Sequence, residues 1–539
     1  MDKLEIIEKW KSQKTKDFFY KKDKKKIKLK KYDRFFGKKL NFGVEGFVGK
    51  MGLGTSKINE FTIAAIAKAY AKFILNNIPE AQKKGIIISH DSRINGEFYS
   101  EIISRVFEKY GISVYSFKVN KPQTSPITSF AITKLKLAGG IVVTAAQLSK
   151  KYNGIKLLDQ KGAQVSSMSR TKIQDIYYSI DPLKVELGIY KPKRIKTILI
   201  KEYIEEVLKI RKRPLDQKLL KVTFVSLSGN QSIIGPKILQ KMDLSYHTLR
   251  KKNKTLKKYY KKDFSFNSKM ILNKSILMAR KKQSDIIIIM DSDSSSIRVI
   301  YKNSKNFWKE LNGNQIAAIV FNYLIKTNKK LNGKVIQSIL SSSLLKEMAK
   351  VQKMDFIETK PGFHNISETG LKNNLITSLS WEQSHGLSVD AKICRDRDGF
   401  QAMIFILEFA NYLKTQNSTF EDELKYLEDK YKYSKTGISI KKLSGEELEE
   451  LFDKIVKTQF INNDSVLKIH NYTKTNNPTE SKILKIVLKS GSWFAIEKSL
   501  INENQKIYYE SLGINKRLVN DTFRKMKSHI NDIVSIIKK

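Results

Sequence analysis

The sequence predicts an α/β protein with several domains, and three observations lead to this prediction. Short apolar runs such as 141–143 end in polar loops and alternate with helical patterns, which is typical of sheets covered by helices. The 539 residues are too many for one hydrophobic core, so several domains that share clefts are expected. With 41% hydrophobic and 10% aromatic residues the composition is globular, and no apolar run reaches the roughly 18 residues needed to cross a bilayer.

The elements follow one another in a regular alternation. The segments that carry the signals are KINEFTIAAIAKAYAKFILNN (57–77, helix), KGIIISHDSR (84–93, strand and loop), YGISVYSF (110–117, strand), AGGIVVTA (138–145, strand), LLKVTFVSLSGNQSIIGPKILQKMDL (219–244, strand, loop and helix), SDIIIIMDSDSSS (284–296, strand and loop), LNGNQIAAIVFNYLIK (311–326, helix), GKVIQSILSSSLLKEMAKVQ (333–352, strand and helix) and FAIEKSLINENQKIYYES (494–511). The Lys-rich stretches 249–269 and 424–447 are predicted to be a surface excursion and the link to a last domain.

The net charge is the strongest compositional signal. Lys and Arg number 101 against 53 Asp and Glu, which leaves +48, far more than solubility requires. An AT-rich genome would also inflate lysine, so the sequence leaves open whether this charge is functional. A functional excess predicts an acidic protein partner or assembly, or weak non-specific binding of polyanions.

The first 40 residues form a basic extension that is densest at 21–31, KKDKKKIKLKK. A solvated arm or helix face and an electrostatic tether both remain open for this extension. The charged first residues lack the apolar core of a signal peptide, and the single cysteine, Cys394, fits a reducing compartment, so we expect a cytoplasmic protein.

Five segments of the chain form a recognisable series: FGVEGFVGKMGLGTSKINEFT (42–62), SHDSR (89–93), TAAQLSKKYNGIK (144–156), DSDSSS (291–296) and WEQSHG (381–386). In this order they resemble the α-D-phosphohexomutase family, which includes phosphoglucomutase and phosphomannomutase. The resemblance implies four domains after the extension at 1–40. Three mixed α/β sandwich domains would occupy 41–195, 196–308 and 309–425, and a C-terminal α+β domain would occupy 426–539. It also implies phosphoryl transfer between O1 and O6 of a hexose phosphate, with a phosphoserine as donor, Mg²⁺ held by three aspartates, and the last domain gripping the substrate's other phosphate.

The position of the phosphoserine falls on Ala146, whose methyl group cannot be phosphorylated. The next three residues, 147–149, also depart from the family pattern, whereas His90, Arg93 and Lys156 are retained nearby. Ser149 or Thr144 could replace the donor, but a misplacement of about 1 Å can cost roughly a hundredfold in rate.

The metal loop keeps Asp291 and Asp293, but its third aspartate is Ser295. Mg²⁺ prefers anionic oxygens in octahedral geometry, so two carboxylates predict weak binding at most. No cofactor is therefore expected, and Mg²⁺ would be needed only if some activity remains. In the sugar-recognition segment Glu382 and Ser384 are retained, which predicts either a contact to a hexose or a capped helix start.

The phosphate-binding loop of the family aligns with EKSLINENQKIY at 497–508, where only Ser499 and Lys506 resemble the original. Glu497 takes the place of an arginine, and bulky side chains replace the Gly-Thr pair at 500–501. A phosphate cradle needs positive charge and close backbone approach, so these changes put hexose phosphate binding in doubt. Glu45, where the family has alanine, is a further departure.

The losses concentrate where donor, metal and phosphate would meet, while the strands and glycines of the framework persist. We therefore predict a phosphohexomutase-like pseudoenzyme that serves as a structural or interaction protein with an acidic partner. An active, divergent phosphoglucomutase or phosphomannomutase is the alternative, and non-specific polyanion binding is a third possibility.

Overall fold

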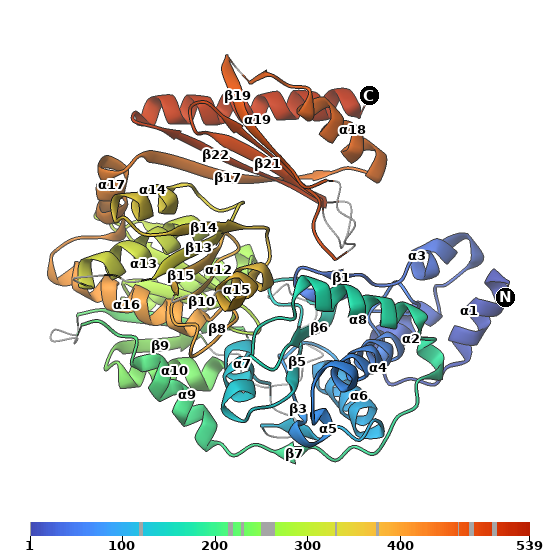
Figure 1. Cartoon of the computed structure of the whole chain (residues 1–539). Coiled ribbons are helices and arrows are strands. Elements are labelled where there is room, and N and C mark those ends of the chain that lie inside the picture. Colours follow the sequence, from blue (N-terminus) through green and yellow to red (C-terminus); the bar gives the residue numbers. More distant parts are fainter. Residues whose placement is uncertain are drawn as a thin grey trace.

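The computed structural model contains four β-sheets, which follow one another along the chain (Figure 1). The described residues are 2–117, 122–213, 219–227, 231–249, 265–328, 331, 333–372, 377–461, 463–473, 479–498 and 504–538. The first three sheets mix parallel and antiparallel pairs, whereas every strand pair of the fourth is antiparallel. This is the predicted architecture of three mixed α/β layers and a C-terminal α+β region. The exact domain boundaries remain a prediction.

The N-terminal extension is folded and is not a solvated arm. It contains α1 (Lys3–Ser12), α2 (Phe18–Lys24), a 3₁₀ turn at Leu29–Lys31 and α3 (Tyr32–Phe36). Apolar side chains three residues apart, such as Ile7 and Trp10, face inward and build a small core with Tyr20 and Phe35. The ring of Trp10 meets Phe61 of α4 edge-on at 5.8 Å, so this core packs directly on the first sheet region.

The first sheet has the strand order β1-β2-β6-β5-β3-β4-β7. Its elements are β1 (Phe42–Gly43), β2 (Gly46–Lys50), α4 (Glu60–Asn77), α5 (Ala81–Lys84), β3 (Ile86–His90), α6 (Gly96–Lys109), β4 (Val114–Ser116), α7 (Ser125–Lys134), β5 (Gly139–Val143), β6 (Tyr152–Leu158), α8 (Ser167–Ser179), a 3₁₀ turn at Pro182–Lys184 and β7 (Lys193–Arg194). Because β3 and β5 are parallel neighbours, the loops that follow them meet at one edge of the sheet.

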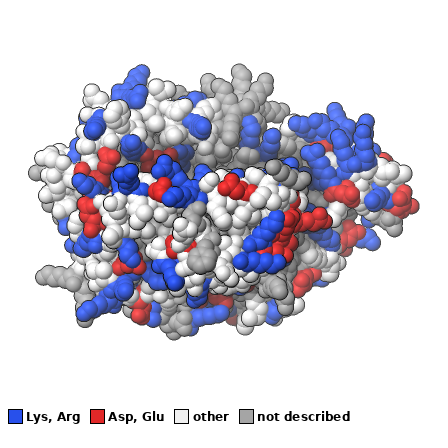
Figure 2. Space-filling model, turned by 90° about the horizontal axis from the view of Figure 1, so that it is seen from above, with Lys and Arg blue, Asp and Glu red and all other residues white. Residues whose placement is uncertain are grey.

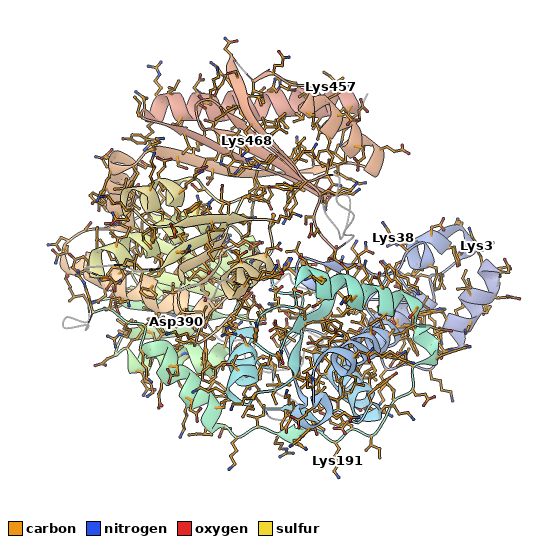
Figure 3. All side chains as sticks on the ribbon, viewed as in Figure 1. Lys3, Lys38, Lys191, Asp390, Lys457 and Lys468 are labelled. Carbon is orange, nitrogen blue, oxygen red and sulfur yellow. The ribbon has the colours of Figure 1, made fainter. Side chains whose placement is uncertain are left out.

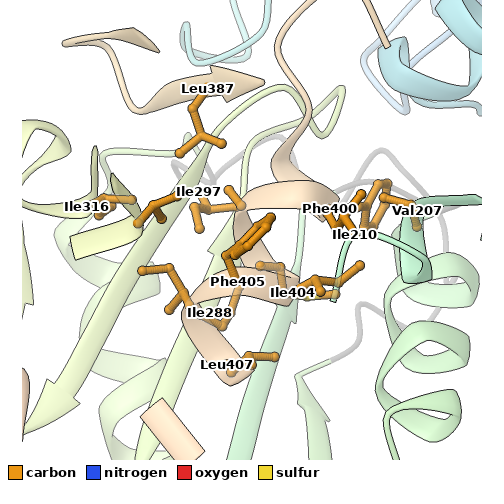
Figure 4. Packing of buried hydrophobic residues seen from close by; sticks show 14 of the residues in the cluster. Val207, Ile210, Ile288, Ile297, Ile316, Leu387, Phe400, Ile404, Phe405 and Leu407 are labelled. Atoms are coloured by element: carbon orange, nitrogen blue, oxygen red, sulfur yellow. The ribbon is translucent and has the colours of Figure 1, made fainter. Parts of the chain in front are cut away.

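The second and third sheets share one continuous core. Their elements are α9 (Ile198–Leu208), β8 (Lys221–Ser226), α10 (Gln231–Lys241), β9 (Ser245–Leu249), α12 (Lys269–Lys281), β10 (Ile286–Met290), β11 (Ile297–Lys302), β12 (Trp308–Leu311), α13 (Gly313–Thr327), β13 (Lys334–Ser338), α14 (Leu344–Val351), β14 (Phe356–Thr359), α15 (Phe363–Lys372), β15 (Thr377–Glu382), β16 (Gly386–Ser388), α16 (Gly399–Thr415) and α17 (Phe420–Lys430). In Figure 4, Phe405 of α16 lies near Ile288 and Ile297 of the second sheet, and Phe400 of α16 lies beside Val207 and Ile210. Leu387 of the third sheet belongs to the same cluster. Most of the predicted excursion at 249–269 lies outside the described residues.

The last region is an antiparallel sheet with helices on one side (Figure 1). It contains β17 (Tyr433–Lys442), α18 (Gly445–Val456), β18 (Phe460–Ile461), β19 (Asp464–Asn471), β20 (Ile483–Leu488), β21 (Trp493–Glu497), β22 (Asn504–Gly513) and α19 (Lys516–Ile537). The stretch 424–447, predicted to be a connector, instead holds the end of α17, all of β17 and the start of α18. Within the described ranges, no helix is long and apolar enough to cross a membrane.

Candidate functional site

Three loops from three different sheets meet at one place. They are the loop 144–151 after β5, the loop 291–296 after β10, and the turn between β15 and β16. The side-chain amide of Gln147 joins all three, because its Nε2 donates to Ser296 Oγ at 3.1 Å and to the backbone oxygen of Ser384 at 2.8 Å. The predicted donor, metal and sugar segments are therefore neighbours, and they are hydrogen-bonded to one another.

Arg93 holds the loop on which Ala146 lies. Its Nη2 donates to the backbone oxygens of Ala146 at 2.6 Å and Leu148 at 2.7 Å, and its Nη1 donates to that of Ser149 at 3.0 Å. Its Nε donates to Asp91 Oδ2 at 3.0 Å, which fixes the guanidinium in place. The N–H groups of the Arg93 guanidinium thus donate to loop carbonyls and to one carboxylate.

Ala146 has a backbone φ of +42°, a conformation that costs a residue with a Cβ about 1 kcal/mol. Its N–H donates to Thr144 Oγ1 at 2.9 Å, and that hydroxyl donates to Asp91 at 2.7 Å. The residue is only 7% exposed. The tip of the loop keeps a tight, buried turn but presents no group that could carry a phosphoryl group.

The histidines near the site have no arrangement for proton transfer. His90 Nδ1 forms a 2.7 Å hydrogen bond with the backbone oxygen of Asp91. His364 is buried, neither ring nitrogen has a hydrogen-bond partner among the described residues, and burial holds its pKa well below its ordinary value. Both rings are buried and pack against the residues around them.

Lys156, a residue of β6, reaches the metal loop with its ammonium and acts as an internal cation there. Its Nζ is 3.0 Å from Asp293 Oδ2 and 3.3 Å from Asp396 Oδ2, and Ser125 Oγ donates to the same oxygen of Asp293. Burial alone would lower the pKa of Lys156, but the two carboxylates outweigh burial and hold it above its ordinary value. Burial would likewise raise the pKa of Asp293, yet Lys156 keeps it below its ordinary value. At neutral pH Lys156 and Asp293 therefore form a buried ion pair.

The carboxylate of Asp291, the other retained aspartate, accepts hydrogen bonds from its own loop. Ser295 Oγ donates to its Oδ2 at 3.0 Å, and the N–H of Ser296 donates to its Oδ1 at 3.1 Å. Burial and then the charge of Asp293 raise the pKa of Asp291 well above its ordinary value.

These donors do not fit Mg²⁺. One carboxylate is paired with a lysine, the other is bonded by loop donors, and the third position is a hydroxyl. No group of three or more His, Cys, Asp or Glu in the described ranges is arranged to hold a metal ion.

The sugar-recognition segment is a strand turn and not the start of a helix. Glu382 ends β15 and accepts the N–H of Gly362 at 2.9 Å. Arg397 lies 3.6 Å from Glu382, donates to Ser384 Oγ at 3.3 Å and forms an ion pair with Glu45. The two retained residues of this segment are therefore tied to Arg397, and Glu45, where the family has alanine, completes the arrangement.

An open cleft of about 420 Å³ lies beside the closed loops. Its lining includes Glu45 and Tyr152 of the first sheet region, Glu382 and Ser384 of the third, and Glu497 and Lys506 of the fourth. Glu497 accepts a hydrogen bond from Tyr508 Oη at 2.9 Å and lies opposite Lys506 on the neighbouring strand. The predicted residue Ser499 lies outside the described residues.

Comparisons with known proteins support the resemblance of the chain to this family. Residues 39–184 match the family model for phosphoglucomutase/phosphomannomutase alpha/beta/alpha domain I, and residues 312–431 match the model for alpha/beta/alpha domain III. The phosphoglucomutase of Staphylococcus aureus strain USA300 is 30% identical over 411 residues, which cover 73% of this chain and 72% of that protein. The chain belongs to the phosphoglucomutase/phosphomannomutase family.

Solved structures of phosphoglucomutase/phosphomannomutase proteins share the fold of this chain. A phosphomannomutase-like structure from Thermus thermophilus superposes with a TM-score of 0.70 at 17% identity, covering 92% of this chain and 99% of the other. The open form of parafusin from Paramecium gives 0.67 at 15% identity, covering 93% and 96%. At such identities the likeness concerns the fold alone.

Several residues of the site were not predicted from the sequence. Gln147 stands out in the sequence only as a departure from the family pattern, and Arg397 and Asp396 were passed over although they form the segment CRDRDG with their neighbours. Their partners lie far away along the chain, since Lys156 and Asp396 are separated by 240 residues. A buried charge so far from its partner leaves no local pattern in the sequence.

Proposed function

We propose that this member of the phosphoglucomutase/phosphomannomutase family does not transfer phosphoryl groups and acts by binding an acidic protein partner. The observation that carries the proposal is the closure of the three loops. The amide of Gln147 is bonded to Ser296 and Ser384, and Ala146 is buried beneath them. A substrate would have to break these hydrogen bonds to reach the loop tip, and Ala146 has no side-chain group that could donate a phosphoryl group to it.

The electrostatics of the centre support the same proposal. Phosphoryl transfer depends on positioned cations that neutralise developing charge. Here the ammonium of Lys156 is shared by Asp293 and Asp396, and the guanidinium of Arg93 is bound to loop carbonyls and to Asp91. Neither cation is available to a phosphoryl group unless the loops rearrange.

The direct test is a coupled mutase assay. Purified protein with Mg²⁺ and a glucose or mannose 1,6-bisphosphate activator should not interconvert the hexose 1- and 6-phosphates, while the Staphylococcus aureus relative serves as the active control. Turnover above about 1 s⁻¹, an ordinary rate for an enzyme, would refute the proposed loss of activity.

One observation favours the second candidate, an active mutase of unusual mechanism. The cleft remains open, and Glu382 and Ser384 line it as a hexose contact would require. An active enzyme would need Thr144 or Ser149 as donor. Incubation with a hexose bisphosphate followed by peptide mass spectrometry should find neither residue phosphorylated, and a phosphorylated Ser149 would favour the enzyme.

A further inference from the structure

We infer that the folded N-terminal extension is a docking surface for an acidic polypeptide segment, which runs over the extension to the mouth of the cleft. This inference rests on the proposed function and locates the binding of the acidic partner on the extension. The residues concerned are exposed and basic, and we call them the basic face: Lys25, Lys28, Lys30, Lys31, Arg34 and Lys38.

The charge of the extension is concentrated and hardly compensated. Residues 21–39 contain eleven Lys and Arg but only two acids, Asp23 and Asp33. Asp23 is turned inward, since its carboxylate accepts the N–H of Leu53. Seen from above, Lys and Arg gather at the end of the molecule that carries the extension (Figure 2). No residue of the basic face belongs to an ion pair within the described part of the chain.

The basic face continues into the cleft. Arg34 and Lys38 line the cleft together with Lys50 and Lys57, and Figure 3 shows Lys38 on the side of the extension toward the fourth sheet region. Burial lowers the pKa of Lys57; Asp23 partly offsets this, and the charges of Arg34 and Lys50 lower it again. Cations therefore crowd at the mouth, and an anion bound there would relieve their repulsion.

The extension lies outside the stretch of the chain that matches the family model. The match to domain I of the family begins at residue 39, so the basic face precedes the matched stretch. The extension has its own core, in which Trp10 and Tyr20 are buried, and this core holds the lysines on a fixed surface. A fixed surface loses less conformational entropy on binding than a disordered arm would.

The chemistry of the surface favours polypeptide carboxylates over nucleic acid. Single-stranded nucleic acid is held by rows of exposed aromatic rings, and Phe18 is the one aromatic side chain in residues 2–41 that is largely exposed. Lysine supplies most of the charge, and its ammonium groups pair with single carboxylates. Leu29, 48% exposed among the lysines, offers an apolar contact that an acidic peptide with some apolar residues can use.

The test measures binding of a fluorescein-labelled peptide of about 12 alternating Glu and Asp residues, which spans roughly 40 Å when extended. Fluorescence anisotropy with the full chain at about 150 mM NaCl, where distant charges are screened, should show saturable binding. The variant with Lys25, Lys28, Lys30 and Lys31 changed to Gln should bind about tenfold more weakly or worse. Circular dichroism should show unchanged folding, because these side chains are exposed.

A matched control removes the same charge elsewhere. Lys191, Lys457, Lys489 and Lys527 are exposed lysines outside the extension, and Figure 3 places Lys191 and Lys457 at distant edges of the molecule. Changing these four to Gln should alter the affinity less than about twofold. A double variant, Arg34→Gln with Lys38→Gln, should weaken binding by a few fold if the segment reaches the cleft mouth.

Three results would overturn the inference. They are equal losses in the extension and control variants, absence of saturable peptide binding at this salt, and tighter binding of a single-stranded oligodeoxythymidine of equal charge. These results are independent of the mutase assay. Turnover would refute the loss of activity and leave the docking surface standing, whereas failed peptide binding would refute the surface without restoring an enzyme.

Discussion

Replacement of Lys156 by Met is the sharpest test of the closed centre. The change keeps an unbranched chain of similar length but removes the ammonium from between Asp293 and Asp396. All three side chains are at most 1% exposed, so solvent cannot take over the lost charge. Removal of one member of a buried ion pair costs about 3–5 kcal/mol, because its partner stays buried without compensation.

This loss should be visible in thermal unfolding. For a domain of the size of the first sheet region, 1 kcal/mol corresponds to about 2–4 °C, so the first transition should fall by roughly 10 °C. Lys191→Met, at an exposed site, should leave the transition within about 1 °C. A second change, Asp293→Asn in the Lys156→Met background, should recover part of the loss because it removes one unpaired charge.

The same variants test the interpretation of the metal loop. Mg²⁺ should leave the transition of the unchanged protein unaltered, because Lys156 occupies Asp293. In Lys156→Met, the carboxylates of Asp293 and Asp396 lose their shared cation, and Mg²⁺ should raise the transition by taking its place. A loss under about 2 °C on Lys156→Met would show that the ammonium is not the buried counter-ion, and stabilisation of the unchanged protein by Mg²⁺ would show that the loop still binds metal.

Three further outcomes are expected. Ala146→Ser alone should not produce mutase activity in the coupled assay, because Lys156 stays paired with Asp293 and Arg93 stays bonded to the loop carbonyls. Turnover by this variant would show that the engaged cations do not prevent phosphoryl transfer. Trp10→Ala should remove about 3–5 kcal/mol from the extension's core, so limited proteolysis should cut there first while the four sheets stay protected; unchanged resistance would contradict the packing. Burial raises the pKa of Asp398 to about 6 from 3.8. Ionisation of this carboxyl therefore lowers the free energy of unfolding as the pH rises through this interval, and the loss is complete above it. Asp398→Asn should therefore gain stability relative to the unchanged protein as pH rises from about 4 to 7, by about 3 kcal/mol at most, and a pH-independent difference in melting temperature would refute this.

Much of the fold could be predicted because it is encoded locally. The run at 286–290 is a buried strand, and the pattern at 57–77 is matched by the helix Glu60–Asn77. The order of five family segments then supplied the arrangement of the sheets. The small core of the extension was not predicted, because the density of lysine hid the spacing of Ile7 and Trp10, which pack inward once the chain turns back on itself.

For the site, the sequence identified the residues that depart from the family pattern. Ala146 and Ser295 could be recognised in this way, since a methyl group cannot carry a phosphoryl group and a hydroxyl is not a carboxylate. The contacts that the altered loops make with one another could not be predicted, because they depend on pairs of residues brought together by folding. Gln147 and Ser384 are separated by 237 residues, and their hydrogen bond exists only because three sheets bring their loops to one point.

The distribution of charge links the altered centre to the extension. On the inner side, Glu497 stands where the family has an arginine, and Lys156 and Arg397 are paired with carboxylates. On the outer side, Arg34 and Lys38 come from residues before the family match and line the same cleft. Carboxylates thus neutralise the cations inside the site, Lys156 and Arg397, which could otherwise bind phosphate. The cations at the mouth of the cleft, Arg34 and Lys38, belong to no ion pair among the described residues. Genome composition alone would add lysines at many exposed places and gives no reason for this asymmetry, whereas the proposed docking of an acidic partner requires unpaired cations at the mouth.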